Sequence, residues 1–125
     1  MPVIQHSEIE AFSLPGLHHQ TIAGRPHGLQ TMETWMQTIE PQAGTPVHRH
    51  DCEEVIVVLR GSGIVTIEGE TVEFGPQSTL VVPPNAVHQI VNTGNEDMFL
   101  VATLGMSPVR VETETGEVIP LPWSA

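Results

Sequence analysis

The sequence predicts an all-β protein in which many short strands form a sandwich or a barrel. Two observations favour this fold class. Eleven glycines and eleven prolines divide the 125 residues into short segments, and such regular punctuation is typical of short strands joined by turns. Apart from a weak signal near residues 7–12, the apolar residues do not recur with the period of a helix.

The predicted elements follow in order along a single domain, residues 1–125. Residues 1–31 are expected to form an N-terminal arm that adds an edge strand, because exposed sheet edges are usually paired or covered. Residues 32–104 are expected to form the core barrel and residues 105–125 the C-terminal strands. Runs of apolar and β-branched residues bounded by Gly, Pro and Asn turns predict strands. These strands are 32–39, 54–59, 63–68, 71–74, 79–82, 87–92, 98–104, 109–113 and 117–121.

The composition excludes several classes of partner. The chain has 15 acidic residues, four arginines and no lysine, which gives a formal net charge of −11. Nucleic acids and anionic membranes attract basic surfaces, so we expect neither as a partner. No apolar run reaches the length of a membrane span, and the first ten residues lack the pattern of a secretory signal. The single cysteine, Cys52, excludes an internal disulfide. We therefore expect a soluble, cytoplasmic protein.

The pattern His48-Arg49-His50, followed by Glu54 and later by His88, predicts a metal site. Side chains at positions i and i+2 lie on the same face of a strand, so His48 and His50 can bind one ion together. Glu54 has the same parity, and His88 lies on a separate extended run that can complete the site from a facing strand. One such histidine alone is usually a half-buried polar residue; the combination indicates a ligand set. Imidazole and carboxylate suit zinc, iron, manganese, nickel, cobalt or copper, so we expect one divalent transition metal ion per chain.

The same residues belong to two motifs that resemble those of the cupin superfamily, in its single-domain cupin_2 type. The first motif runs from Gly44 to Gly61, and the second comprises Gly75, Pro83, His88 and Asn92. Asn85 stands where a glycine is usual, and asparagine tolerates the positive φ of a tight turn. The resemblance implies a double-stranded β-helix, or jelly-roll, barrel that holds the metal through His48, His50, Glu54 and His88. It also implies a homodimer.

A closer resemblance, to the plant auxin-binding protein family, covers residues 17–24, 33–38, 45–55 and 120–123. In that family zinc and a wall of apolar and aromatic residues hold an aromatic acetic acid by its carboxylate. The resemblance implies a small-molecule pocket lined by Trp35, Gln37, Thr45, Pro46, Ile56 and Trp123. Ile56 stands where the plant proteins have phenylalanine. The signal peptide, retention tail and disulfide of the plant proteins have no counterpart here, so we expect a bacterial-type relative whose ligand need not be auxin.

The residues leave three hypotheses for function. Four protein ligands leave one or two metal positions open for water, a carboxylate or dioxygen. The protein can therefore be a binding module for a small carboxylate. It can instead be an enzyme, either a non-haem iron or manganese oxygenase or a metal-assisted isomerase or decarboxylase. In the third hypothesis the metal only stabilises the barrel. The chain has no tyrosine and no lysine, two common acid–base groups, which fits oxygenase chemistry better than proton transfer. We favour the binding module, and we assign no catalytic residue.

Several other polar side chains are expected to have structural roles. Arg49 should face away from the metal ligands and pair with an acidic neighbour. Cys52 lies in an acidic stretch, whereas a nucleophilic cysteine requires a positive environment. Four further histidines show no ligand spacing with the metal ligands: His6, His18, His19 and His27. His18 and His19 can reach the mouth of the barrel, but we favour a solvated or capping role for them.

Overall fold

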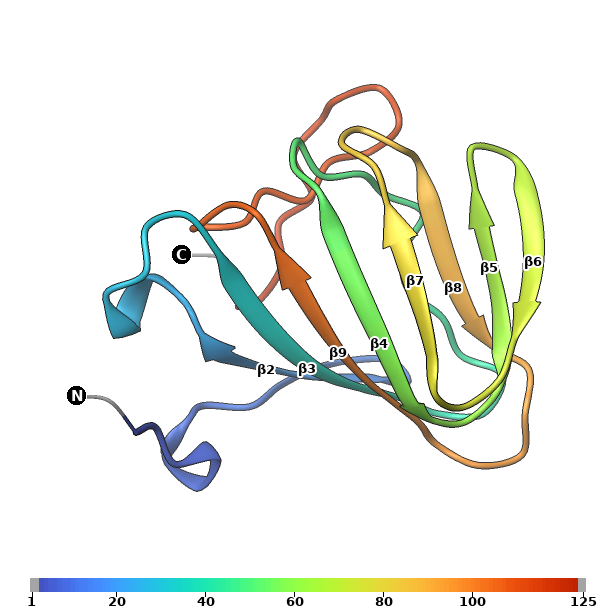
Figure 1. The fold of residues 1–125 in the computed structure, drawn as a ribbon, viewed down its shortest axis with the longest axis horizontal. Helices are drawn as coiled ribbons and strands as arrows, with labels where there is room; N and C mark the ends of the chain where they lie inside the picture. The colour runs from blue at the N-terminus through green and yellow to red at the C-terminus, as the bar shows by residue number, and fades with distance from the viewer. Residues whose placement is uncertain (1–2, 124–125) are drawn as a thin grey trace.

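Two antiparallel β-sheets make up the structure, a computed structural model that describes residues 3–123 (Figure 1). The larger sheet has the strand order β1-β2-β3-β9-β4-β7 and the smaller has the order β6-β5-β8. The strands are β1 (Phe12–Leu14), β2 (Leu17–Ala23), β3 (Glu33–Ile39), β4 (Glu54–Arg60), β5 (Gly63–Ile67), β6 (Glu70–Phe74), β7 (Ser78–Val82), β8 (His88–Asn92) and β9 (Met98–Leu104). The helical elements of this part of the chain are two three-residue turns, η1 (His6–Glu8) and η2 (Arg25–His27). The predicted all-β jelly roll is confirmed.

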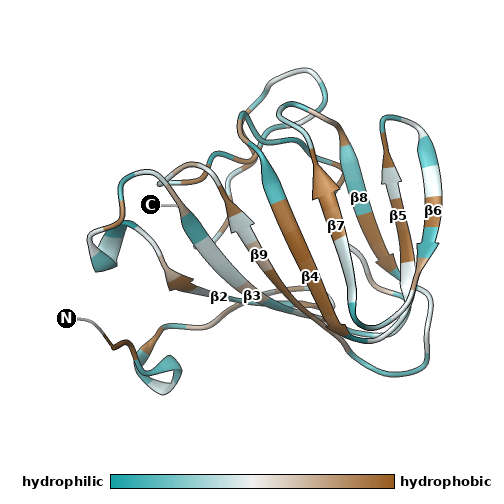
Figure 2. Ribbon diagram, in the orientation of Figure 1, coloured by the Kyte–Doolittle hydropathy of each residue, from teal (hydrophilic) through white to brown (hydrophobic). Residues whose placement is uncertain are grey.

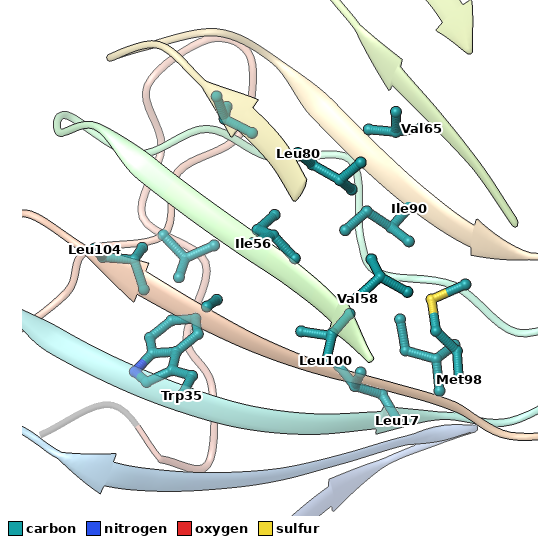
Figure 3. Close-up of a cluster of buried hydrophobic side chains, with 14 of the residues drawn as sticks. Leu17, Trp35, Ile56, Val58, Val65, Leu80, Ile90, Met98, Leu100 and Leu104 are labelled. Carbon is teal, nitrogen blue, oxygen red and sulfur yellow. The ribbon is translucent and has the colours of Figure 1, made fainter. Parts of the chain in front are cut away.

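Alternation of side chains along the strands builds the core between the sheets. In β4, Ile56 and Val58 point inward and are buried, whereas Val55 and Val57 point outward and are exposed. The inward residues of β3 and β9 alternate in the same way. Trp35, Ile56, Val58 and other inward side chains form one apolar cluster (Figure 3). Fully burying each aliphatic side chain contributes about 1.5–3 kcal/mol, so this cluster is the main source of stability.

The seven strands predicted between residues 32 and 104 agree with β3 to β9 to within one residue at each end. Strand β2 was not predicted, although it lies in the arm that we expected to add an edge strand; it pairs along β3 from Leu17 opposite Ile39. The buried polar side chain of His19 interrupts the apolar alternation that would have revealed this strand. In the part of the chain that the structure describes, no helix is long and apolar enough to span a membrane.

The two C-terminal strands predicted at 109–113 and 117–121 are wrong. Between Leu104 and Trp123 the structure has only isolated bridges, Arg49 to Glu112 and Glu112 to Val118. A strand needs the edge of a neighbouring strand for its hydrogen bonds, and the C-terminal segment has none beside it. Its neighbour around Arg49 is itself irregular and offers only an isolated bridge. Side chains of this C-terminal segment instead reach the site described below.

Candidate metal centre and ligand pocket

An irregular segment before β4 brings two of the predicted metal ligands together. The backbone of His48 exchanges both hydrogen bonds with that of His88 at the start of β8, at 3.0 and 2.8 Å. Their imidazole ring centres are 4.2 Å apart. Four residues earlier, a Cβ on Gly44 would lie 2.7 Å from the carbonyl oxygen of Ile90. Glycine is therefore required for this segment to approach β8 so closely.

His50 and Glu54 complete the cluster from either side of a turn. Both side chains are buried, and Glu54 is the first residue of β4. The Glu54 Oε1 lies 3.6 Å from His50 Nε2 and 3.2 Å from His88 Nε2. One ring nitrogen from each of His48, His50 and His88 lies within 4.8 Å of the others. The structure thus brings all four predicted ligand residues to one place, and three buried histidines this close together can hold a metal ion.

Each of the three imidazoles is oriented by a backbone carbonyl. The Nδ1-to-oxygen distances are 2.6 Å from His48 to Pro46, 2.9 Å from His50 to Arg110 and 2.8 Å from His88 to Ala86. A carbonyl oxygen only accepts, so each Nδ1 donates, and in the neutral form of such a ring Nε2 carries the lone pair. This is the arrangement by which proteins fix a metal-binding histidine.

Burial keeps His48 and His50 in the form that binds metal. Burial, with smaller contributions from His88 and His50, lowers the pKa of His48 to about 3. Burial also lowers the pKa of His50, and the nearby Glu54 carboxylate only partly opposes it. A neutral imidazole is a ligand, whereas a protonated one is not.

Three buried polar atoms in the cluster have no hydrogen-bond partner within the described residues 3–123: His50 Nε2, His88 Nε2 and Glu54 Oε1. Each unsatisfied buried atom costs about 1–3 kcal/mol. Two imidazole nitrogens and a carboxylate oxygen facing one another are also the donors that a divalent transition metal prefers. The residues present therefore fit such an ion, which would satisfy all three atoms at once.

A small cavity adjoins the cluster. Its volume is ≈ 30 Å³, and His48, Glu54 and His88 form one side of it. All six residues expected in the ligand pocket line it: Trp35, Gln37, Thr45, Pro46, Ile56 and Trp123. Other lining residues were not predicted, and among them Val111 and Leu121 come from the C-terminal segment. Their place could not be inferred because that segment forms no regular strand.

A second and larger cavity lies next to the first. It has a volume of ≈ 720 Å³ and lies between the N-terminal arm, the η2 region and the C-terminal segment. Trp35 and Trp123 line both cavities, with ring centres 5.9 Å apart in an edge-to-face arrangement. These two indoles therefore separate the space beside the histidines from the larger cavity.

His19 has a role that the sequence did not reveal. The prediction of a solvated or capping side chain is wrong for His19, which is 1% exposed. Its ring stacks on Trp123 with centres 3.8 Å apart and meets Trp35 edge-on at 4.8 Å. Burial lowers the pKa of His19 to about 3, so its ring is neutral. Leu17, His19 and Thr21 alternate along the sequence, so in a strand they would lie on one face. Because two of the three are polar, the segment lacked the apolar alternation by which a strand is recognised.

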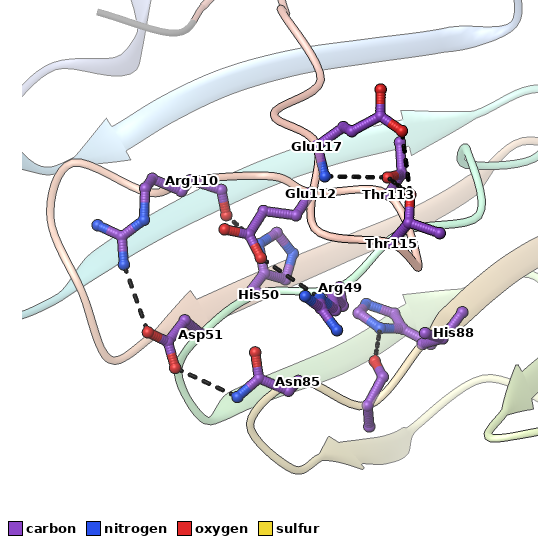
Figure 4. A network of polar contacts seen from close by, with 12 residues as sticks. Arg49, His50, Asp51, Asn85, His88, Arg110, Glu112, Thr113, Thr115 and Glu117 are labelled. Carbon is purple, nitrogen blue, oxygen red and sulfur yellow. Dashed lines mark hydrogen bonds and ion pairs between the residues drawn. The ribbon is translucent and has the colours of Figure 1, made fainter.

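The other polar groups near the site are structural. Arg49 pairs with Glu112 at 3.3 Å, as expected, and Arg110 contacts Asp51 at 3.6 Å (Figure 4). Asn85 adopts the positive φ, 61°, that its turn position predicts. Burial raises the pKa of Cys52, which keeps its thiol protonated and weakly nucleophilic.

Comparisons with known proteins agree with these features. Residues 3–121 match the family described as auxin binding protein. The chain is 40% identical to auxin-binding protein 1 of Arabidopsis thaliana in an alignment of 110 positions, gaps included, that covers 80% of this chain and 56% of that protein. It is 40% identical to auxin-binding protein T85 of Nicotiana tabacum in an alignment of 126 positions, gaps included, that covers 89% of this chain and 67% of that protein. The chain thus spans between about half and two thirds of the length of these relatives.

Solved structures with low sequence identity share the fold. The polyketide cyclase RemF from Streptomyces resistomycificus superposes with a TM-score of 0.74 at 20% identity, covering 99% of this chain and 89% of that one. An RmlC-like cupin from Shewanella frigidimarina gives 0.75 at 18% identity, covering 86% and 93%. The oxalate decarboxylase formate complex from Lactobacillus farciminis gives 0.78 at 17% identity, covering 86% and 34%. At these identities the likeness shows a cupin fold and does not show a shared activity.

Proposed function

The chain belongs to the auxin-binding protein family and has a cupin fold, and on this basis we propose that it binds a small carboxylate at a metal centre. The ion is held by His48, His50, Glu54 and His88. The observation that carries the proposal is the convergence of three buried, unpartnered donor atoms on one point beside a cavity. Zinc suits a binding role because it has no redox chemistry.

The charge balance of the cavity supports an anionic ligand. Its described lining contains no arginine, the chain has no lysine, and burial lowers the pKa of His48 and of His50 so that these two rings are neutral. A divalent ion bound by one glutamate leaves a net charge of +1, which complements one carboxylate. The remaining lining is apolar or aromatic apart from the amide of Gln37 and the hydroxyl of Thr45, and this is the usual make-up of a small-molecule site.

The size of the cavity indicates how an aromatic ligand would fit. A volume of ≈ 30 Å³ has room for about one water molecule, so a ring-bearing acid requires displacement of the wall towards the larger cavity. Trp123 is suited to move, because its side chain is only partly buried and its indole nitrogen has no hydrogen-bond partner among residues 3–123. The metal centre and the larger cavity would then form one continuous ligand site.

Calorimetry tests the proposal directly. Zinc-loaded protein should bind phenylacetate or indole-3-acetate, and protein stripped with a chelator should not. Elemental analysis should find about one metal ion per chain, lost in His50→Ala, because removing one ligand opens the site. Absence of metal-dependent binding across aromatic and aliphatic acids would refute the binding function.

Oxygen chemistry is the second candidate, because the cavity contains no acid–base side chain beyond the proposed metal ligands. An ion with open positions can itself activate dioxygen, whereas isomerisation needs proton-transfer groups. Near-stoichiometric iron or manganese in the purified protein, with oxygen uptake on phenolic or diketone substrates, would favour the enzyme.

The outer face of β4 and β7 supports the homodimer that we also propose. Val55, Val57, Leu59 and Val81 are 36–67% exposed there, and Val55 lies directly opposite Val81. In Figure 2 most of β4 and the arrowhead end of β7 have the colour of hydrophobic residues. In a chain with net charge −11, an uncharged apolar face is where a second copy can approach with least repulsion. Light scattering should give a dimer that becomes a monomer in Val57→Glu; a monomeric parent protein would refute it.

A further inference from the structure

Gln37 and His19 form a hydrogen-bonded pair at the wall of the metal cavity. They lie directly opposite each other on β3 and β2, so the sheet register fixes their approach. The amide nitrogen of Gln37 is 3.0 Å from His19 Nδ1. On the other side of the ring, His19 Nε2 is 2.8 Å from the Thr21 hydroxyl oxygen. Gln37 lines the small cavity, whereas Thr21 lines the large one. The chain of three side chains thus connects the two cavities.

This chain of hydrogen bonds has one direction. The pKa of His19, about 3, keeps the ring neutral, with one donor and one acceptor nitrogen. An amide NH₂ only donates, so Nδ1 of His19 accepts from Gln37 and Nε2 donates to Thr21. Stacking on Trp123 and the edge contact with Trp35 hold the ring in this orientation.

The direction determines which end of the Gln37 amide the cavity can use. The amide nitrogen of Gln37 is paired with His19, and the carbonyl oxygen Oε1 of Gln37 has no hydrogen-bond partner among residues 3–123. This oxygen is not fully enclosed by the protein, so a ligand can reach it. Gln37 is therefore left with a free acceptor in a cavity whose other side is formed by the proposed metal ligands.

We propose that His19 is a specificity-determining residue: by accepting the amide hydrogen of Gln37 it leaves the Gln37 carbonyl oxygen to the cavity, which selects carboxylate ligands that also carry an N–H or O–H donor. The inference rests on the proposed function, and it narrows the ligand class. A ligand that fills the cavity shields this acceptor from water, so an analogue that lacks the donor leaves the acceptor unpaired and is rejected.

Matched ligand pairs test the selection on metal-loaded full-length protein. Indole-3-acetate and 1-methylindole-3-acetate differ by an N–H far from the carboxylate. Mandelate and its 2-methoxy analogue differ by an O–H beside it. In at least one pair the donor ligand should bind about tenfold more tightly, as expected for one buried hydrogen bond.

Two variants of His19 separate the acceptor from the ring. His19→Leu removes the acceptor and should reduce the preference to about one. His19→Asn should retain it, because Oδ1 of asparagine occupies nearly the position of Nδ1 and accepts the same hydrogen. Both variants lose the stack on Trp123, so the difference between them reports the acceptor alone. Metal content and melting temperature establish that each variant is folded and loaded.

Each outcome bears on a different claim. If all four ligands bind the metal-loaded protein but neither pair shows a preference, or if the preference survives in His19→Leu, the role of His19 is wrong and the binding function stands. If none of the four ligands binds, the proposed function is contradicted, and the specificity inference falls with it.

Discussion

His50 donates its Nδ1 proton to the backbone carbonyl of Arg110, which lies 60 residues further along the chain and 2.9 Å away. The other two imidazoles of the cluster are held locally, each by the carbonyl two residues before it. One proposed metal ligand is therefore oriented by the C-terminal segment, which also supplies Val111, Leu121 and Trp123 to the cavity wall. Metal affinity and the shape of the ligand pocket depend on the same segment.

Loosening that segment should weaken metal binding. In Val111→Ala a buried contact next to Arg110 is lost, so the carbonyl holds His50 less firmly. We expect zinc affinity to fall about tenfold, as is typical when a hydrogen bond to a metal-bound histidine is disturbed. Competition with a chromophoric chelator measures this.

Val118→Ala is the matched control, because Val118 lies on the same segment but is 64% exposed. Its zinc affinity should equal that of the parent protein. If Val111→Ala melts at a lower temperature but binds zinc as tightly as the parent, the C-terminal segment does not orient His50.

The pH dependence of stability should carry the signature of His19. Its pKa falls from 6.5 to about 3 on folding, so below pH 6.5 the unfolded chain binds more protons than the folded one. Stability is then complete above about pH 6.5 and is lost as the pH falls towards 3, by up to about 1.4 kcal/mol per pH unit for this one group. Urea unfolding of chelator-treated protein at several pH values measures the slope.

His19→Asn should make that slope shallower between pH 6 and 4. His48 and His50 titrate in the same direction in metal-free protein, so only the difference between the parent protein and the variant isolates His19. An identical slope in both proteins would mean that His19 is not buried as a neutral ring.

Most of the barrel and the centre of the site could be predicted from sequence, because both rest on local periodicity. Parity along an extended segment is sufficient to place His48, His50 and Glu54 together, and apolar runs define β3 to β9. The failures have one physical origin. In β2 and in the C-terminal segment, residues such as His19 and Val111 are buried by tertiary contacts rather than by a repeating pattern. The large cavity and the role of His19 depend on those contacts.

Trp35 should be needed for ligand binding and dispensable for metal binding. Its indole lines the cavity, is 4% exposed and donates a hydrogen bond to Glu33 at 2.8 Å. Trp35→Ala should abolish binding of aromatic acids while leaving one metal ion per chain, and truncating a buried tryptophan costs about 3–5 kcal/mol of stability. Trp35→Phe preserves most of the packing and should bind weakly. Unchanged binding in Trp35→Ala would show that the pocket lies elsewhere.

Trp123 should control the rate at which ligands reach the metal. The cavity beside the histidines is too small for an aromatic acid, and the indoles of Trp123 and Trp35 separate it from ≈ 720 Å³ of further space. Opening it requires Trp123 to leave its stack on His19, which costs about 0.5–1.5 kcal/mol beyond the lost burial. Trp123→Ala removes this step, so the association rate in stopped-flow experiments should rise, while loss of an aromatic wall should raise the dissociation rate more. An unchanged association rate with faster dissociation would identify Trp123 as a fixed wall, and the ligand would then have to reach the metal by displacing a different part of the C-terminal segment.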